Sequence, residues 1–169
     1  MNKLNYFWVI LYMVVALASQ ALGNVIIMNK AEPELSEIIK EKILWDREAL
    51  LKIQYSPGGV VDAYQTAVNL LYYTNHGVQI RGGCYSACTL FTKLSGHEKS
   101  CATPDAILYF HKPFTMDGFE KIPASDWYTK AFINLYPQDV QDWIEKEGGL
   151  PVDGWIQTPA TKFFKECKI

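Results

Sequence analysis

Apolar residues recur along residues 24–110 with two different periods, and these periods predict the elements of the fold. Short runs rich in β-branched residues are typical of strands, whereas apolar positions three and four apart are typical of amphipathic helices. The predicted strands are 24–28, 49–54, 78–81, 100–102 and 107–110. The predicted helices are 34–45, 60–73 and 86–95. Strand and helix therefore alternate, which indicates βαβ units, a mostly parallel sheet and an α/β fold.

The C-terminal part is predicted to be helical. One helix is expected over 125–136, a second over 139–147 with Gly148 and Gly149 after it, and a short last one from Pro159 to about Cys167. Six aromatic residues in this part are expected to pack against the sheet rather than to form a ligand cage. They are Trp127, Phe132, Trp143, Trp155, Phe163 and Phe164.

Three motifs fall at the ends of predicted strands. Ser56-Pro-Gly-Gly59 follows one strand, a glycine pair and then Ser86 follow the next, and His111 ends another. The carboxyl ends of parallel strands meet at one edge of a sheet, and sites form there. We therefore expect Gly59, Ser86 and His111 to lie close together.

Ser86 stands at the junction between a predicted strand and a predicted helix. A serine at such a turn exposes its hydroxyl beside the free N–H groups of the helix start. Acyl-transfer chemistry needs a nucleophile with backbone donors next to it. The alternative is that Ser86 only caps the helix.

Composition narrows the classes of function. The chain has 169 residues, of which 49% are hydrophobic and 20% charged, as expected of a single globular domain with a sizeable core. The formal net charge is −2 and there is no basic stripe, which argues against nucleic acid as a partner. Cys84 and Cys88 lack a second closely spaced ligand pair, so we expect no metal and no cofactor.

Residues 1–23 are typical of a signal peptide. Lys3 precedes an apolar run at 6–18, and small residues at Ala21 and Gly23 predict cleavage before Asn24. The mature chain would then be one domain, 24–169, in a secreted or periplasmic protein. The alternative is an uncleaved anchor, with aromatic residues of the run at the membrane interface.

An exported chain with an even number of cysteines is expected to form disulfides. The four cysteines allow three pairings. Cys84 and Cys88 flank the serine turn and lie close in sequence, so a bridge between them would brace Ser86. Cys101 and Cys167 then form the second predicted pair.

Three stretches carry a resemblance to a known family: Ser56-Pro-Gly-Gly59, Gly83-Cys-Tyr-Ser-Ala-Cys88 and Leu108-Tyr-Phe-His111. Together they resemble the Clp-type serine proteases. More narrowly, the chain is similar to exported Clp-protease-like proteins that carry Cys-x-Ser-Ala-Cys around the serine. The resemblance covers residues 50–113, and the segment 136–150 with a later cysteine also resembles the narrower group. It implies a crotonase-like ββα superhelix.

The resemblance also implies roles. Ser86 matches the nucleophile, His111 the general base, and the amides of Gly59 and Ala87 the oxyanion donors. The implied function is a secreted or periplasmic serine hydrolase, a peptidase acting on peptides or proteins. The alternative is a catalytically inactive crotonase-like module for binding or assembly. Homo-oligomers are expected by analogy with the fold.

The chain departs from the family pattern in two respects. The acidic third member has no clear match, and four residues remain open for that role: Asp105, Asp117, Asp139 and Asp153. No surface for docking an ATP-driven unfoldase is recognisable, so no such partner is expected. A Ser/Lys dyad is the competing arrangement, but Lys93 lies two helical turns beyond Ser86, and His111 fits better.

Overall fold

The computed structural model describes residues 25–28, as backbone only, and residues 50–168. The predicted signal peptide and the predicted helix over 34–45 lie outside the described residues.

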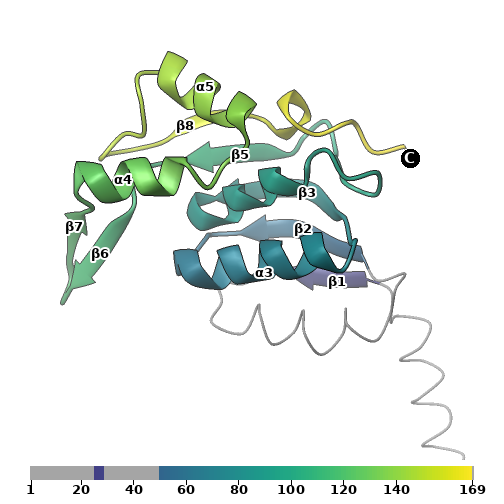
Figure 1. Ribbon diagram of the computed structural model, residues 1–169, viewed down its shortest axis with the longest axis horizontal. Coiled ribbons are helices and arrows are strands. Elements are labelled where there is room, and N and C mark those ends of the chain that lie inside the picture. The colour runs from purple at the N-terminus through teal and green to yellow at the C-terminus, as the bar shows by residue number, and fades with distance from the viewer. Residues whose placement is uncertain (1–24, 29–49, 169) are drawn as a thin grey trace, which may run out of the picture.

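A six-stranded sheet forms the centre of the molecule (Figure 1). Its strands, in spatial order, are β1 (Val25–Met28), β2 (Leu50–Ser56), β3 (Val78–Tyr85), β5 (Ile107–Phe110) and β8 (Ile156–Pro159), and β4 (Cys101–Ala102) also pairs with β3. All pairs are parallel except β5 with β8, which is antiparallel. The prediction of an α/β fold with a mostly parallel sheet is confirmed.

Two helices, α3 (Val61–Tyr73) and η1 (Ser86–Leu94), pack together against the sheet. α3 buries one stripe, which is formed by Tyr64, Ala67, Val68 and Leu71. η1 is a 3₁₀ helix, and all of its residues from Ala87 to Leu94 except Lys93 are buried. The alternate residues of β2, β3 and β5 that face these helices, such as Ile53, Ile80 and Leu108, are buried as well. The turn that holds Ser86 is therefore anchored in the hydrophobic core.

β3 is longer than predicted, because it continues through Gly82 and Gly83 to Tyr85. A Cβ atom on Gly82 would lie 2.1 Å from the carbonyl oxygen of Gln54 on β2. The register between β2 and β3 shifts at this place, so the glycine admits a neighbouring backbone that comes unusually close. The glycines thus extend the strand rather than end it, and β3 runs directly into Ser86.

The C-terminal part is only partly helical. α4 (Asp126–Ile133) and α5 (Gln138–Lys146) form as predicted, and the Ser125 hydroxyl accepts a hydrogen bond from the N–H of Tyr128. The predicted last helix is wrong, because Pro159 ends strand β8 and only a short 3₁₀ turn, η2 (Ala160–Lys162), follows. Pairing with β8 satisfies the backbone groups along the edge of β5, which a helix there would leave unpaired.

A hairpin that the sequence analysis missed projects beyond the sheet beside α4 (Figure 1). It consists of β6 (Phe114–Asp117) and β7 (Glu120–Pro123), and every residue of both strands is exposed. Asp117 pairs with Glu120, so the two-residue turn is formed by Gly118 and Phe119, and Gly118 has a φ of +61°. Glycine at the first central position is typical of a tight hairpin turn, so this signal was present in the sequence.

Two disulfides join Cys84 to Cys88 and Cys101 to Cys167, which is the expected pairing. The second bridge and a hydrogen bond from the N–H of Cys167 to the carbonyl of Ala102 attach the C-terminal segment to β4. Disulfides of this kind are typical of proteins in an oxidising compartment. Among the described residues, no helix has the length and apolar character needed to cross a membrane.

Candidate active site

A cleft of about 950 Å³ opens at the carboxyl edge of the sheet. The segments that follow β2, β3 and β5 all reach it, and they contribute Gly58, Gly59, Ser86 and His111 to its lining. The hairpin, α4 and the segment before β8 form the remaining walls. The expectation that these strand ends meet at one edge therefore agrees with the arrangement in the structure.

Ser86 has a left-handed backbone conformation, with a φ of +55°. This conformation costs a residue with a side chain about 1–2 kcal/mol, so the neighbouring structure must impose it. Tyr85 is the N-cap residue of η1, and no side chain caps this helix end. Ser86 is therefore not simply a helix cap, and its hydroxyl group is available for other contacts.

The hydroxyl group of Ser86 contacts the imidazole of His111. Ser86 Oγ lies 2.7 Å from His111 Nε2. Ser86 can donate this hydrogen bond only to an unprotonated Nε2. The proton of the neutral imidazole is then on Nδ1. The side chain of His111 is only 8% exposed, so most of the ring is withdrawn from water.

The surroundings of His111 keep its imidazole neutral. Burial lowers the pKa of His111, the positive charge of Lys121 lowers it further, and a backbone hydrogen bond with Lys112 acts in the opposite direction. The histidine is therefore predominantly neutral at pH 7, which is the form that can accept a proton.

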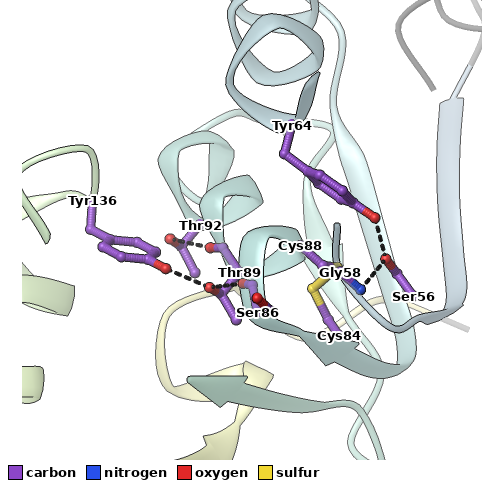
Figure 2. Close-up of a disulfide and its surroundings, with 9 residues drawn as sticks. All are labelled: Ser56, Gly58, Tyr64, Cys84, Ser86, Cys88, Thr89, Thr92 and Tyr136. Carbon is purple, nitrogen blue, oxygen red and sulfur yellow. Dashed lines mark hydrogen bonds between the residues drawn. A yellow bond between two sulfur atoms is a disulfide. The ribbon is translucent and has the colours of Figure 1, made fainter. Parts of the chain in front are cut away.

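Two buried hydroxyl groups support the carbonyl of Ser86 (Figure 2). The Thr89 hydroxyl donates to that carbonyl at 2.6 Å. Thr89 has only one hydroxyl proton, and the carbonyl of Ser86 accepts it. In the contact of 2.7 Å between Thr89 and Tyr136, the phenol is therefore the donor. Burial raises the pKa of Tyr136, so the phenol keeps this proton. The turn at Ser86 is thus attached to the segment between α4 and α5.

A second pair of hydroxyl groups supports the loop after β2, on the other side of Ser86 (Figure 2). Ser56 Oγ lies 2.7 Å from the phenol oxygen of Tyr64, and the N–H of Gly58 donates to Ser56 Oγ at 3.4 Å. Both side chains are fully buried. The glycine loop is therefore attached to α3 as well as to β2.

Gly58 packs directly against the turn that holds Ser86, a role that sequence reasoning missed. Its φ is +81°, and a Cβ atom there would lie 2.6 Å from Ser86 Cβ and 3.2 Å from the nitrogen of Ala87. The space beside the Ala87 amide therefore exists because residue 58 has no side chain. Gly59 lines the cleft. The oxyanion roles of Gly59 and Ala87 remain predictions.

Gly58→Ala is expected to slow reaction of Ser86 with an acylating probe at least tenfold, because displacing one oxyanion donor costs about 10²-fold or more. The new methyl group would also meet the carbonyl oxygen of Tyr85 at 2.5 Å. Gly118→Ala is the matched control, since its φ is also positive but no atom lies within 4 Å of the added Cβ. Labelling kinetics of the two variants decide the matter, and equal rates would contradict the assigned role of Gly58.

No carboxylate forms a hydrogen bond or an ion pair with His111 among the described residues. Asp105 interacts with Thr103, Asp139 accepts from the N–H of Val140, and Asp117 lies on the exposed hairpin. Asp153 alone of the four predicted candidates lines the cleft.

The lysine alternative finds little support in the geometry. Lys93 Nζ donates to Asn69 at 3.3 Å, and Lys112 Nζ forms an ion pair with Asp126 at 2.8 Å. Neither lysine lines the cleft. His111 therefore remains the base candidate that contacts Ser86.

Six aromatic residues were expected to pack against the sheet. Phe132, Trp143 and Phe164 are buried, whereas Trp127 is 79% exposed, so the expectation is wrong for Trp127. Trp155 contacts Tyr85 and Tyr109 of the sheet as expected, but it is 45% exposed and also lines the cleft beside His111.

Comparison with protein-family models and with curated protein sequences finds no match to this chain. Within the described residues, no cluster of three or more His, Cys, Asp or Glu side chains is arranged to hold a metal ion.

Proposed function

We propose that the protein is a secreted or periplasmic serine hydrolase that acts on peptides or proteins. The observation that carries the proposal is the contact of 2.7 Å between Ser86 Oγ and His111 Nε2, at a left-handed turn in an open cleft. A fold of the crotonase-like ββα type and a self-associating chain are part of the same proposal. Both rest on the sequence resemblance.

In the first half of the proposed reaction, Ser86 Oγ attacks the substrate carbonyl while His111 Nε2 accepts its proton. The amides of Gly59 and Ala87 are the proposed donors to the oxyanion that forms. The protonated His111 then gives its proton to the leaving amine, and an acyl group remains on Ser86.

In the second half, water attacks the acyl group on Ser86. His111 accepts the proton of this water and returns it to Ser86 Oγ as the acid product leaves. No external cofactor is needed, because the proton moves only between the reactants and His111.

The walls of the cleft favour a substrate with apolar side chains. Phe114, Phe132, Val152 and Trp155 line it together with Pro113 and Pro123. A volume of about 950 Å³ lies within the usual range for pockets that bury a ligand of several residues. Short peptides with bulky apolar residues next to the scissile bond are therefore the substrates to test first.

A fluorophosphonate probe tests the proposal directly, because an activated serine displaces its fluoride and becomes phosphonylated. The oxidised protein is incubated with the probe, digested and analysed by mass spectrometry. We expect one adduct, on the peptide that contains Ser86. Protein that is folded and oxidised but acquires no adduct would contradict the hydrolase function.

Labelling is expected to rise with pH and to reach its plateau at or below neutral pH. The neutral imidazole is the active form, and burial together with Lys121 places the pKa of His111 below its usual value of about 6.5. Lowering the pH through that pKa protonates the base and stops the reaction. The measurement is the labelling rate from pH 4 to 9. A midpoint clearly above 6.5 would contradict the assigned environment of His111.

The second candidate is a crotonase-like module for binding or assembly that has no catalytic activity. The lack of a carboxylate partner for His111 among the described residues favours it, because the acidic member fixes the tautomer of the base in a triad. The same labelling experiment separates the two functions, since a binding module would leave Ser86 unmodified.

A further inference from the structure

Trp155 contacts His111 and the residue that precedes Ser86. Its ring meets the imidazole of His111 edge to face, with centroids 4.4 Å apart and planes at 71°. It also meets Tyr85, the residue before Ser86, with centroids 5.4 Å apart and planes at 80°. A third edge contact joins it to Tyr109, at 6.3 Å.

The two tyrosines give Trp155 a rigid support. Tyr85 and Tyr109 are register partners in the β3–β5 pair, and their rings stack with centroids 4.1 Å apart and planes at 2°. Strand pairing therefore fixes the surface on which the indole rests. Phe114, on the hairpin, also contacts the imidazole of His111, with centroids 5.3 Å apart. The His111 ring thus has two aromatic neighbours.

The segment that carries Trp155 is attached to the strand of the base. The N–H of Lys112 donates to the carbonyl of Pro151 at 2.8 Å, directly after His111. Trp155 then leads into β8, which pairs with β5. The backbone before and after Trp155 is therefore anchored to β5 and the residue after it, although the indole is partly exposed.

We propose that Trp155 is a positioning residue, which fixes the rotamer of His111 so that Nε2 stays within reach of Ser86 Oγ. The expected change in labelling rate rests on the proposed hydrolase function. The expected change in the orientation of the His111 imidazole does not. With two aromatic neighbours, the imidazole cannot rotate Nε2 away from Ser86 Oγ without displacing one of them. Packing thus holds the rotamer, and the tautomer follows from the hydrogen bonds that this rotamer permits, to Ser86 Oγ and to the backbone of Lys112.

The charges around the base do not change when Trp155 is replaced. The ionisable groups that line the cleft with His111, among the described residues, are Asp62, Lys121, Tyr128 and Asp153. None of them is altered by the substitution of a neutral indole. A change in the behaviour of the imidazole would therefore report lost confinement.

The test compares Trp155→Leu, which removes the aromatic ring and leaves a smaller apolar side chain, with Trp155→Phe, which keeps a ring. We expect the labelling rate of Ser86 to fall about thirtyfold in the leucine variant, less than the roughly 10²- to 10⁴-fold that loss of the general base itself would cost. The phenylalanine variant should stay within about threefold of wild type by the same scale. Trp127→Leu is the control, because Trp127 is exposed and does not line the cleft.

Nitrogen-15 NMR of the His111 ring gives a readout that does not depend on activity. In wild type we expect a single neutral tautomer with the proton on Nδ1. In Trp155→Leu we expect a mixture of tautomers and a pKa that moves up towards its usual value, with Trp155→Phe close to wild type. A leucine variant that keeps the wild-type tautomer, whether or not its labelling falls, would overturn the proposal.

The two failures are distinguishable. If wild-type protein does not label, the hydrolase function is wrong, but the tautomer comparison still decides whether Trp155 orients His111. If wild type labels and the leucine and phenylalanine variants label equally fast, the hydrolase function stands and the positioning role is wrong.

Discussion

Ser86→Ala is expected to abolish fluorophosphonate labelling, and His111→Ala to lower the labelling rate by about 10²- to 10⁴-fold, the range expected for loss of a general base. The two side chains share one hydrogen bond of 2.7 Å, so each substitution removes a different half of the same pair. The free energy of unfolding should change by only about 1 kcal/mol in Ser86→Ala, since a single hydrogen bond is lost.

His97→Ala is the matched control for the histidine. His97 Nε2 contacts Asn75 Oδ1 at 2.9 Å and does not line the cleft, so its removal should leave the labelling rate unchanged. Activity-based labelling followed by intact-mass measurement gives all the rates. If His111→Ala labelled as fast as wild type, the base would have to be another group.

Replacing Cys84 and Cys88 by alanine is expected to lower the labelling rate at least tenfold, while replacing Cys101 and Cys167 leaves it nearly unchanged. The first bridge spans four positions and encloses Ser86, whose left-handed backbone needs support. The tenfold figure corresponds to about 1.4 kcal/mol, which is similar to the cost of that conformation.

The order of the stability effects should be reversed. The first bridge joins cysteines that are 4 positions apart, and the second joins cysteines that are 66 positions apart. In the chain-entropy model the losses are about 2 and about 4 kcal/mol, respectively. Urea unfolding and labelling at a temperature where both variants are folded provide the two measurements. A variant without the second bridge that stays folded but no longer labels would show that Ser86 depends on more than its own bridge.

The parts of the fold that could be predicted are those governed by local pattern. The apolar periods of β2, α3 and β5 predict a parallel sheet, and its topology alone brings the residues after Ser56, Tyr85 and Phe110 to one edge. The proximity of Ser86 and His111 follows from that placement, whereas the orientation of the imidazole does not.

The parts that could not be predicted depend on contacts between distant segments. The sequence around Gly82 predicts the end of a strand, but β3 continues there because Gly82 leaves room for the carbonyl of Gln54 on the neighbouring strand. Pro159 predicts the start of a helix, but it ends β8, which pairs with the edge of β5. Gly58 and Trp155 likewise gain their roles from residues on other elements.

The hydroxyl chain from Tyr136 through Thr89 to Ser86 has a consequence for biosynthesis. Thr89 and Tyr136 are 47 positions apart, so the support of the nucleophile does not exist until that much more chain has left the ribosome. His111 is also made later than Ser86, by 25 positions. On the proposed function, a nascent chain that carries Ser86 but not yet His111 and Tyr136 would therefore lack both the base and the support of the serine turn.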